Sequence, residues 1–417
     1  MRTSLEPIAV IGMGCRFSGE ASSPESFWDM LLKGRSAHGK VPSSRYEASA
    51  WYHPSHERKG AINHDSGFFL AEDPSLFDAP FFSITAKEAA GMDPAQRLLL
   101  EVAYEAFENG GVPMETLLGS STAVYSGCMT NDYELLSTRD LLDMPHNSAT
   151  GNGRAMLANR LSWFFDLRGL SVMTDTACSS SLTALHLATQ ALRAGECNMA
   201  LLTGANLILH PNYTQKLSYM HMLSADAVAD GDAIRAIIGA TGINQDGRTP
   251  GITMPNQEAQ ADLIRRVYDY DPESMKKTAY LEAHGTGTAI GDPAELAAIG
   301  DTLGAARTPE NEPLYVGSVK GNIGHTEGAA GVASLIKVVL CLEHAMLVPN
   351  AGFEKVNPRI RLDEWRLRLC QDATPWPAHM PQRASINSFG FGGSNAHAVI
   401  ESASEFFGSP HKYAPPE

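Results

Sequence analysis

The sequence lacks any C-x-x-C pair and has only six cysteines among its 417 residues. Zinc ribbons and thioredoxin-type redox motifs need cysteines paired at that spacing, so the sequence argues against both. The cysteines lie mostly in apolar runs, which suits a reducing compartment. They are Cys15, Cys128, Cys178, Cys197, Cys341 and Cys370.

Positive charge is also scarce, because 32 Lys and Arg oppose 47 Asp and Glu and give a net charge of -15. An acidic surface argues against nucleic acid or an anionic membrane as the main partner. The first residues show no basic region followed by a long apolar core, as a signal peptide would. The longest apolar stretch, residues 328–348, is interrupted by Lys337 and Glu343, and therefore predicts a core helix and not a membrane span. We expect a cytoplasmic protein.

Short apolar runs typical of buried strands alternate with longer runs at helical spacing. This alternation predicts an α/β fold with mainly parallel sheets covered on both faces. Both halves repeat the same succession, which indicates a duplicated α/β unit, with residues 1–224 as the first half and residues 225–417 as the second. The expected strands are 8–14, 122–128, 170–176, 199–207, 234–243, 279–285, 314–320, 384–390 and 396–402.

Cys178 lies in "TDTACSSSL", between a strand-like run and a helix-like run. A cysteine at a helix N-terminus meets backbone N–H groups and the positive end of the helix dipole, which stabilise a thiolate. The alternative is a buried, inert cysteine that acts as a small hydrophobic residue. This segment alone leaves both interpretations open.

Two histidines lie in Gly-rich turns at strand ends, His284 in "LEAHGTGTAIGD" and His325 in "SVKGNIGHTEGAAG". The second turn also carries Lys320 and Glu327. Catalytic groups gather at the carboxyl ends of strands in open α/β sheets, and glycine lets a substrate approach the backbone. Either histidine alone is also compatible with a purely structural hydrogen-bonding role.

Several site classes are disfavoured by the spacing of these motifs. The Gly-rich turns lack a G-x-G-x-x-G pattern with its acidic partner, and lack G-K-[ST], so neither a dinucleotide site nor a phosphate loop is expected. The two histidines lie far apart in sequence without companions at metal-ligand spacing, so zinc is not expected. One cysteine and two histidines instead suit acyl transfer, in which the imidazoles stabilise an oxygen that gains charge.

At these motifs the chain resembles the β-ketoacyl synthases of the thiolase-like superfamily, and more closely the ketosynthase domain of fungal highly reducing polyketide synthases. The resemblance rests on "EPIAVIGMGCRF", "DTACSSSL", "GINQDGRT", "EAHGTGT", "NIGHTEGAAG" and "NSFGFGGSNAHAVIE", which occur in this order from about Glu6 to the end of the chain. It implies a thiolase-like fold with αβαβα layers and two mostly parallel, mixed sheets.

The resemblance also implies roles for residues. Cys178 would carry the acyl chain, while His284 and His325 would promote decarboxylation of a malonyl thioester and stabilise its enolate. Lys320 and Glu327 would support the network around His325. The N–H groups of Cys178 and Phe391 would form an oxyanion hole. The expected substrate-binding residues are Thr286, Thr288, Gly390, Gly392 and Asn322.

The resemblance implies no bound cofactor and no metal. The partners would be acyl and malonyl thioesters and the phosphopantetheine arm of an acyl carrier protein. It further implies a homodimer in which the strand at 170–176 pairs across a two-fold axis. Two alternatives stay open: a degenerate ketosynthase that serves as a non-catalytic dimer or docking partner, and a thioester acyltransferase or hydrolase.

The chain departs from the family pattern after Ser224. The family continues there with a Gly-rich segment and a Val-rich strand, whereas this sequence runs directly into "ADAVADGDAIRAIIGA". Two alternatives follow: either residues are missing from the given sequence between Ser224 and Ala225, or the chain is continuous there. A continuous chain would leave the strand at 199–207 without a neighbour, with backbone groups exposed along an apolar edge, and we would then expect weak activity or none. Gly321 is a smaller departure, since the family more often has Ser, Ala or Thr after the lysine.

Overall fold

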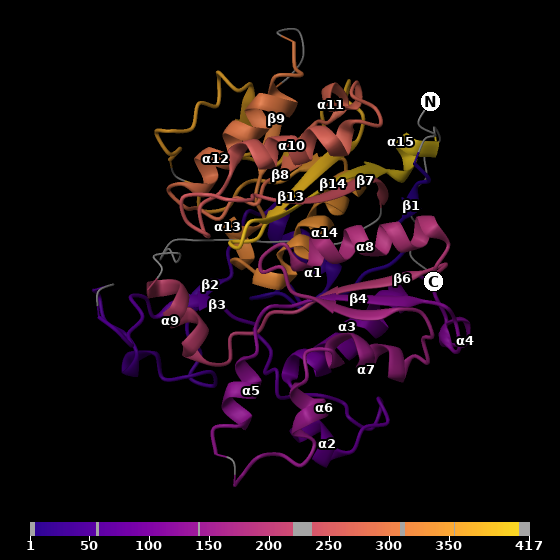
Figure 1. The fold of residues 1–417 in the computed structure, drawn as a ribbon, viewed down its shortest axis with the longest axis vertical. Coiled ribbons are helices and arrows are strands. Elements are labelled where there is room, and N and C mark those ends of the chain that lie inside the picture. Colours follow the sequence, from indigo (N-terminus) through magenta and orange to yellow (C-terminus); the bar gives the residue numbers. More distant parts are fainter. Residues whose placement is uncertain are drawn as a thin grey trace.

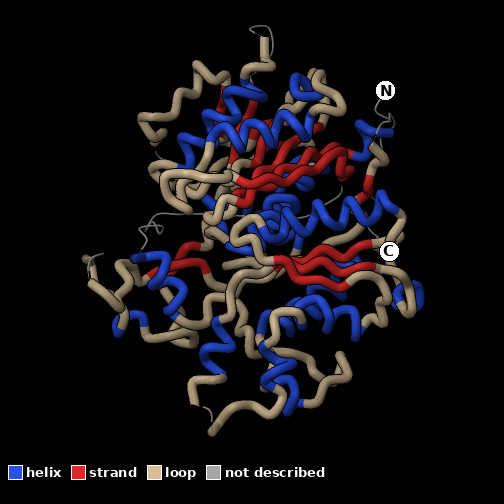
Figure 2. Tube along the Cα trace, viewed as in Figure 1, coloured by secondary structure: helices blue, strands red, loops and turns tan. Residues whose placement is uncertain are grey.

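The chain folds into five alternating layers of helices and sheets, which follow one another from top to bottom in Figure 1 and stand out by colour in Figure 2. The computed structural model describes residues 5–55, 58–140, 142–219, 236–308, 313–353 and 355–407. This layering agrees with the expected thiolase-like α/β fold.

The larger sheet is mixed. Among the described residues its seven strands stand in the order β1 (Ile8–Ala9), β7 (Ala236–Gln245), β14 (Ser394–Ser402), β13 (Arg383–Phe389), β8 (Tyr280–Glu282), β9 (Leu314–Gly317) and β11 (Leu367–Leu369). β13 pairs in parallel with β8, and β8 with β9, whereas β14 runs antiparallel to both of its neighbours, β13 and β7.

The smaller sheet is wholly parallel. Its described strands stand in the order β5 (Ser171–Thr174), β4 (Ala123–Gly127) and β6 (Ala200–Gly204). Every residue of β4 is buried, because this central strand is covered on both faces. The carboxyl end of β5 leads directly into the turn that carries Cys178.

Helices fill the three remaining layers. The middle layer holds α8 (Ser180–Ala194) and α14 (Ala330–Glu343), and α14 is buried along nearly its whole length, as expected for a helix that is apolar on all sides. The outer layers contain α3 (Pro94–Asn109) and α7 (Met156–Phe164) on the smaller sheet, and α10 (Gln257–Tyr268) and α12 (Gly291–Ile299) on the larger one.

The remaining described elements are short and lie in the connections between layers. The strand pairs are β2 (His38–Lys40) with β3 (Ser66–Phe68), and β10 (Met346–Leu347) with β12 (Thr374–Pro375). The helices are α1 (Pro24–Leu32), α2 (Ala86–Ala90), α4 (Met114–Leu117), α5 (Asp132–Ser137), α6 (Ser148–Asn152), α9 (Pro211–Tyr219), α11 (Ser274–Lys277), α13 (Lys320–Ile323) and α15 (Ala403–Phe407), with helical turns at Ala48–Ala50, Gly300–Gly304 and Glu327–Ala329.

The strand expected at 8–14 is the clearest error of the sequence analysis. Only Ile8–Ala9 forms a strand, and it pairs with β7 of the larger sheet. The following residues pack against α3, where a Cβ on Gly12 would lie 2.3 Å from the carbonyl oxygen of Ala106. The junction at Ser224–Ala225 lies outside the described residues, and the division at that junction stays a prediction.

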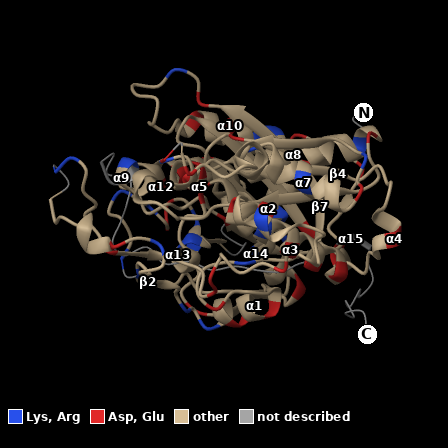
Figure 3. Ribbon diagram, turned by 90° about the horizontal axis from the view of Figure 1, so that it is seen from below, with Lys and Arg blue, Asp and Glu red and all other residues tan. Residues whose placement is uncertain are grey.

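The charged side chains are distributed as expected for an acidic protein with an apolar core. In Figure 3 the charged residues lie mainly on outer helices and loops, with acidic residues along α1 and near α15. None of the described helices is long and apolar enough to cross a membrane.

The two middle helices approach each other at Gly331 of α14 and Leu182 of α8. A Cβ on Gly331 would lie 2.5 Å from the backbone nitrogen of Leu182, so any side chain there must push the helices apart. We predict that Gly331→Val lowers the free energy of unfolding by about 1–3 kcal/mol or more, through overpacking. Gly392→Ala is the control, since its Cβ meets no atom within 4 Å. Denaturant unfolding checks this, and equal stability of the two variants would contradict it.

Candidate active site

Cys178 lies in a tight turn between β5 and α8. The preceding residue, Ala177, adopts a φ of +57°, and Ser180 Oγ accepts a hydrogen bond of 2.9 Å from the backbone N–H of Thr176. Ser388 Oγ donates to the Cys178 carbonyl at 2.8 Å and thereby ties the turn to the end of β13. These contacts present the sulfur at the junction of the two sheets.

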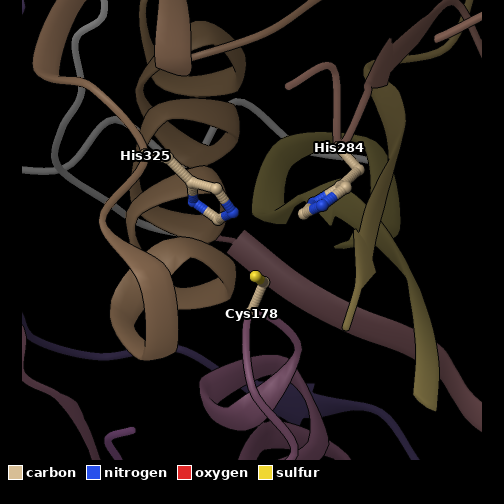
Figure 4. Close-up of side chains that lie close together, drawn as sticks. All are labelled: Cys178, His284 and His325. Carbon is tan, nitrogen blue, oxygen red and sulfur yellow. The ribbon is translucent and has the colours of Figure 1, made fainter. Parts of the chain in front are cut away.

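The two histidines meet above this sulfur, as Figure 4 shows. His284 follows β8, and His325 follows α13. Their ring centroids lie 5.3 Å apart with an interplanar angle of 78°. One donor atom from each histidine and Cys178 Sγ all lie within 4.8 Å of one another. Three motifs that are far apart in sequence therefore form one cluster.

The same geometry corrects one argument from the sequence. The separation of the two histidines in the sequence does not argue against a zinc site, because Cys178, His284 and His325 lie close enough in space to share an ion. That no metal is bound stays a prediction.

Both imidazoles are neutral at physiological pH. Burial and the positive charge of Lys320 hold the pKa of each ring well below 6.5, and His325 lowers that of His284 further. His325 Nδ1 accepts a hydrogen bond of 3.2 Å from the Glu327 N–H, so the ring proton is on Nε2, which has no hydrogen-bond partner among the described residues. Nε2–H is therefore a free donor at the cluster.

The environment of the thiol differs from the sequence-based expectation. Burial, together with the nearby carboxylate of Glu327, raises the pKa of Cys178 well above 9, although Lys320 and the Phe391 N–H lower it. Sγ lies 3.6 Å from Glu327 Oε2. Of the two interpretations that the sequence left open, these surroundings therefore favour a buried thiol that keeps its proton in the free protein over a thiolate stabilised by the helix end.

Lys320 and Glu327 lie inside this cluster as buried charges. Lys320 Nζ has no hydrogen-bond partner among the described residues, and burial lowers its pKa, while Glu282 and Glu295 raise it. Burial raises the pKa of Glu327 to about 7, with the Cys178 hydrogen bond and Lys320 acting in the opposite direction. Glu327 therefore changes its charge near neutral pH.

Sequence reasoning missed Glu295, which holds the His284 turn. Its Oε1 accepts hydrogen bonds from the His284 N–H and from Asn387 Nδ2, both at 2.8 Å, and Oε2 accepts one from the Gly285 N–H at 2.9 Å. Glu295 lies on α12. In the sequence it resembles any acidic residue of a helix, so no motif pointed to this role.

A second missed group is the fully buried pair of Glu282 and Lys337. Lys337 Nζ contacts both Glu282 Oε2 and the Tyr280 hydroxyl, and Glu282 Oε1 accepts a hydrogen bond of 2.5 Å from the Val319 N–H. This pair joins β8 to the turn that carries Lys320. The sequence did contain a sign of this pair, because Lys337 interrupts an otherwise apolar run.

A cavity of about 1000 Å³ opens onto the cluster. It is lined by Thr286, Thr288, Gly390 and Phe391, and of the catalytic candidates also by Cys178, His284, His325 and Glu327 but not by Lys320. Two expected substrate-binding residues are not among its lining residues. They are Gly392 and Asn322. The Asn322 side chain instead donates a hydrogen bond of 3.0 Å to the Arg35 carbonyl and fixes a loop that is distant in sequence.

Three family models match the chain. The model "Beta-ketoacyl synthase, N-terminal domain" covers residues 5–237, "Beta-ketoacyl synthase, C-terminal domain" covers residues 235–354, and "Ketoacyl-synthetase C-terminal extension" covers residues 357–414.

Curated relatives include the highly reducing polyketide synthases cnsI of Penicillium expansum, 69% identical over 98% of this chain, and alnA of Emericella nidulans, 55% identical over 97%. The chain spans only 18% of each relative's length.

Among solved structures, the ketosynthase domain OzmH KS7 of Streptomyces albus is similar with a TM-score of 0.89 and 33% identity, covering 99% of this chain and 77% of that one. The ketosynthase from module 6 of the Bacillus subtilis bacillaene synthase has a TM-score of 0.84 and 35% identity, covering 98% of this chain and 73% of that one.

We predict that Glu327→Gln makes Cys178 more reactive. Removing the carboxylate lowers the pKa of the thiol, and a thiol whose pKa falls by one has about tenfold more thiolate. Because the pKa of Glu327 is about 7, its charge is mostly present at pH 8 and mostly lost at pH 6. The gain in iodoacetamide alkylation, mapped by peptide mass, should therefore be larger at pH 8. Glu258→Gln, an exposed and distant change, should have no effect. Equal rates for wild type and Glu327→Gln at pH 8 would contradict the prediction.

Proposed function

The chain belongs to the β-ketoacyl synthase family, and on that premise we propose that Cys178, His284 and His325 carry out chain elongation for a highly reducing polyketide synthase. The proposal rests on one observation above all, which is that a buried thiol and two neutral imidazoles converge on one cavity. Neutral imidazole N–H groups stabilise developing negative charge without a metal.

The first step is acyl transfer from a carrier thioester to Cys178. The sulfur attacks the thioester carbonyl, the new C–S bond forms, and the carrier thiol leaves with the proton that Cys178 gives up. We assign the N–H groups of Cys178 and Phe391 to the oxyanion hole. The Phe391 N–H supports this assignment, because it is already directed at Sγ and lowers the pKa of the thiol.

The second step is decarboxylative condensation. A malonyl thioester loses CO₂, and the enolate oxygen that forms accepts hydrogen bonds from His284 and from Nε2–H of His325. The enolate carbon then attacks the Cys178 thioester, so that a C–C bond forms, the C–S bond breaks and the thiolate regains a proton from solvent. Burial, together with the positive charge of Lys320, lowers the pKa of both rings and keeps them neutral.

We propose that Thr286 and Thr288 hold the phosphopantetheine arm of an acyl carrier protein. Both line the cavity, their hydroxyl oxygens lie 3.4 Å apart, and Thr288 Oγ1 accepts a hydrogen bond of 3.1 Å from the Gly291 N–H. The arm enters as part of the substrate, and no bound cofactor is part of the proposal. The cytoplasmic location expected from the sequence stays a prediction.

We predict that His284→Ala and His325→Ala lose condensation by about a hundredfold or more while they still acylate Cys178. Enolate stabilisation is a later step than thioester exchange, and one such donor contributes on this order. Intact mass measures acylation, and product analysis after addition of malonyl carrier measures condensation. Cys178→Ala is the matched variant that should lose both. A histidine variant that condenses at the wild-type rate would contradict the role in condensation assigned to that histidine.

We also propose a homodimer joined along β5. This strand is a free edge of the smaller sheet among the described residues, and Leu170 beside it is 57% exposed. Leu170→Glu should therefore yield a monomer in light scattering at micromolar concentration. Ile252→Glu, at a residue that is 81% exposed elsewhere, should leave the mass unchanged. A wild-type monomer would refute the proposal.

A further inference from the structure

The motif "NSFGFGGSNAH", residues 387–397, begins and ends with polar residues that the proposed function does not use. They are Asn387 and His397, which are 0% and 1% exposed and stand directly opposite each other in the antiparallel pairing of β13 with β14. Side chains of directly opposite residues lie on the same face of a sheet. Polar groups as deeply buried as these are normally hydrogen-bonded, and their hydrogen bonds lead to the candidate active site.

The two side chains form a chain of hydrogen bonds with one direction. Asn387 Nδ2 donates to Glu295 Oε1 at 2.8 Å, because a carboxylate oxygen can only accept. The amide oxygen of Asn387 therefore faces His397, and it lies 2.7 Å from Nδ1 of that ring. Burial lowers the pKa of His397 to about 3, so the ring is neutral and its single proton is on Nδ1. His397 thus donates to Asn387, which in turn donates to Glu295.

Glu295 passes this constraint on to His284. Its Oε1 accepts from both Asn387 and the His284 N–H, and its Oε2 accepts from the Gly285 N–H. Two of these three donors belong to the turn that the carboxylate holds, whereas Asn387 is a donor from β13, in the interior of the larger sheet. The hydrogen bond from Asn387 therefore fixes the carboxylate relative to the sheet, and the carboxylate fixes the turn.

The same hydrogen bond supports the charge of Glu295. Burial raises the pKa of this carboxyl group, and the hydrogen bonds from Gly285, Asn387 and His284 oppose that effect, together with the positive charge of Lys320. Glu295 is in turn one of the carboxylates that raise the pKa of Lys320 against its burial. Because His397 is neutral, the chain stabilises the carboxylate without a further positive charge beside it.

We propose that Asn387 and His397 are positioning residues for His284 and act on it through Glu295. His397 holds the Asn387 amide in one orientation, Asn387 holds the carboxylate, and the carboxylate holds His284 opposite His325. Neither residue lines the cavity, so neither touches the reacting atoms. The inference rests on the proposed role of His284 in condensation.

The test compares His397→Leu with His397→Asn. Leucine and asparagine have nearly the same shape, but only asparagine has a donor at the place of Nδ1. We expect amide hydrogen exchange at His284 and Gly285 to become faster by about tenfold or more in His397→Leu, and to stay close to the wild-type rate in His397→Asn. Equal exchange rates in the two variants would overturn the proposal.

A second arm measures the chemistry of the same variants. We expect His397→Leu to lose condensation by about tenfold or more while it still acylates Cys178, and His397→Asn to recover most of the wild-type rate. Loss of acylation in the same proportion as condensation would show general structural damage and overturn the proposal. Exchange needs no substrate, so failure of this inference is distinguishable from failure of the proposed function, in which acylated wild type does not condense.

A double variant, Asn387→Leu/His397→Leu, separates positioning from stability. It replaces both partners by apolar side chains and leaves no unpaired group between them, so we expect it to melt closer to the wild-type temperature than His397→Leu does. Glu295 still loses its donor from β13, and we therefore expect exchange at His284 and Gly285 to stay fast and condensation to stay slow. Exchange and condensation at wild-type rates in the double variant would overturn the proposal.

Discussion

The close approach of α8 and α14 is the constraint on which the candidate site depends. Cys178 lies just before α8 and Glu327 just before the start of α14, so the distance between these helices sets the distance between the two side chains. Gly331 allows the contact with Leu182, and Sγ consequently lies 3.6 Å from the Glu327 carboxylate. Cys178 is thereby placed against the charged turn that carries Glu327.

Buried charges hold the rest of the cluster in place. Glu295 fixes the backbone of His284, while Glu282, paired with Lys337, fixes the turn before Lys320. Because these groups are shielded from water, their charges act strongly on one another. Burial and Lys320 keep the imidazoles neutral, and burial with Glu327 keeps the thiol protonated. The free protein thus holds neutral reacting groups within a shell of buried ions.

Local sequence predicted much of this arrangement, since the strand–turn–helix pattern at Cys178 and the Gly-rich turns at His284 and His325 are local signals. The sequence-based predictions failed where contacts between distant parts of the chain determine the structure. The raised pKa of Cys178 depends on burial and on Glu327, 149 residues away, and Asn322 bonds to Arg35, 287 residues away. Residues 10–14 have strand-like composition, yet they form no strand, because α3 and the edge of the larger sheet determine their conformation.

The most direct test of the account is a single turnover of acylated protein with a malonyl carrier thioester whose free carboxyl group is isotopically labelled. The account predicts one labelled CO₂ for each acyl group that leaves Cys178, with the acyl group recovered in the elongated product. Loss of the acyl group as free acid, without release of CO₂, would contradict it.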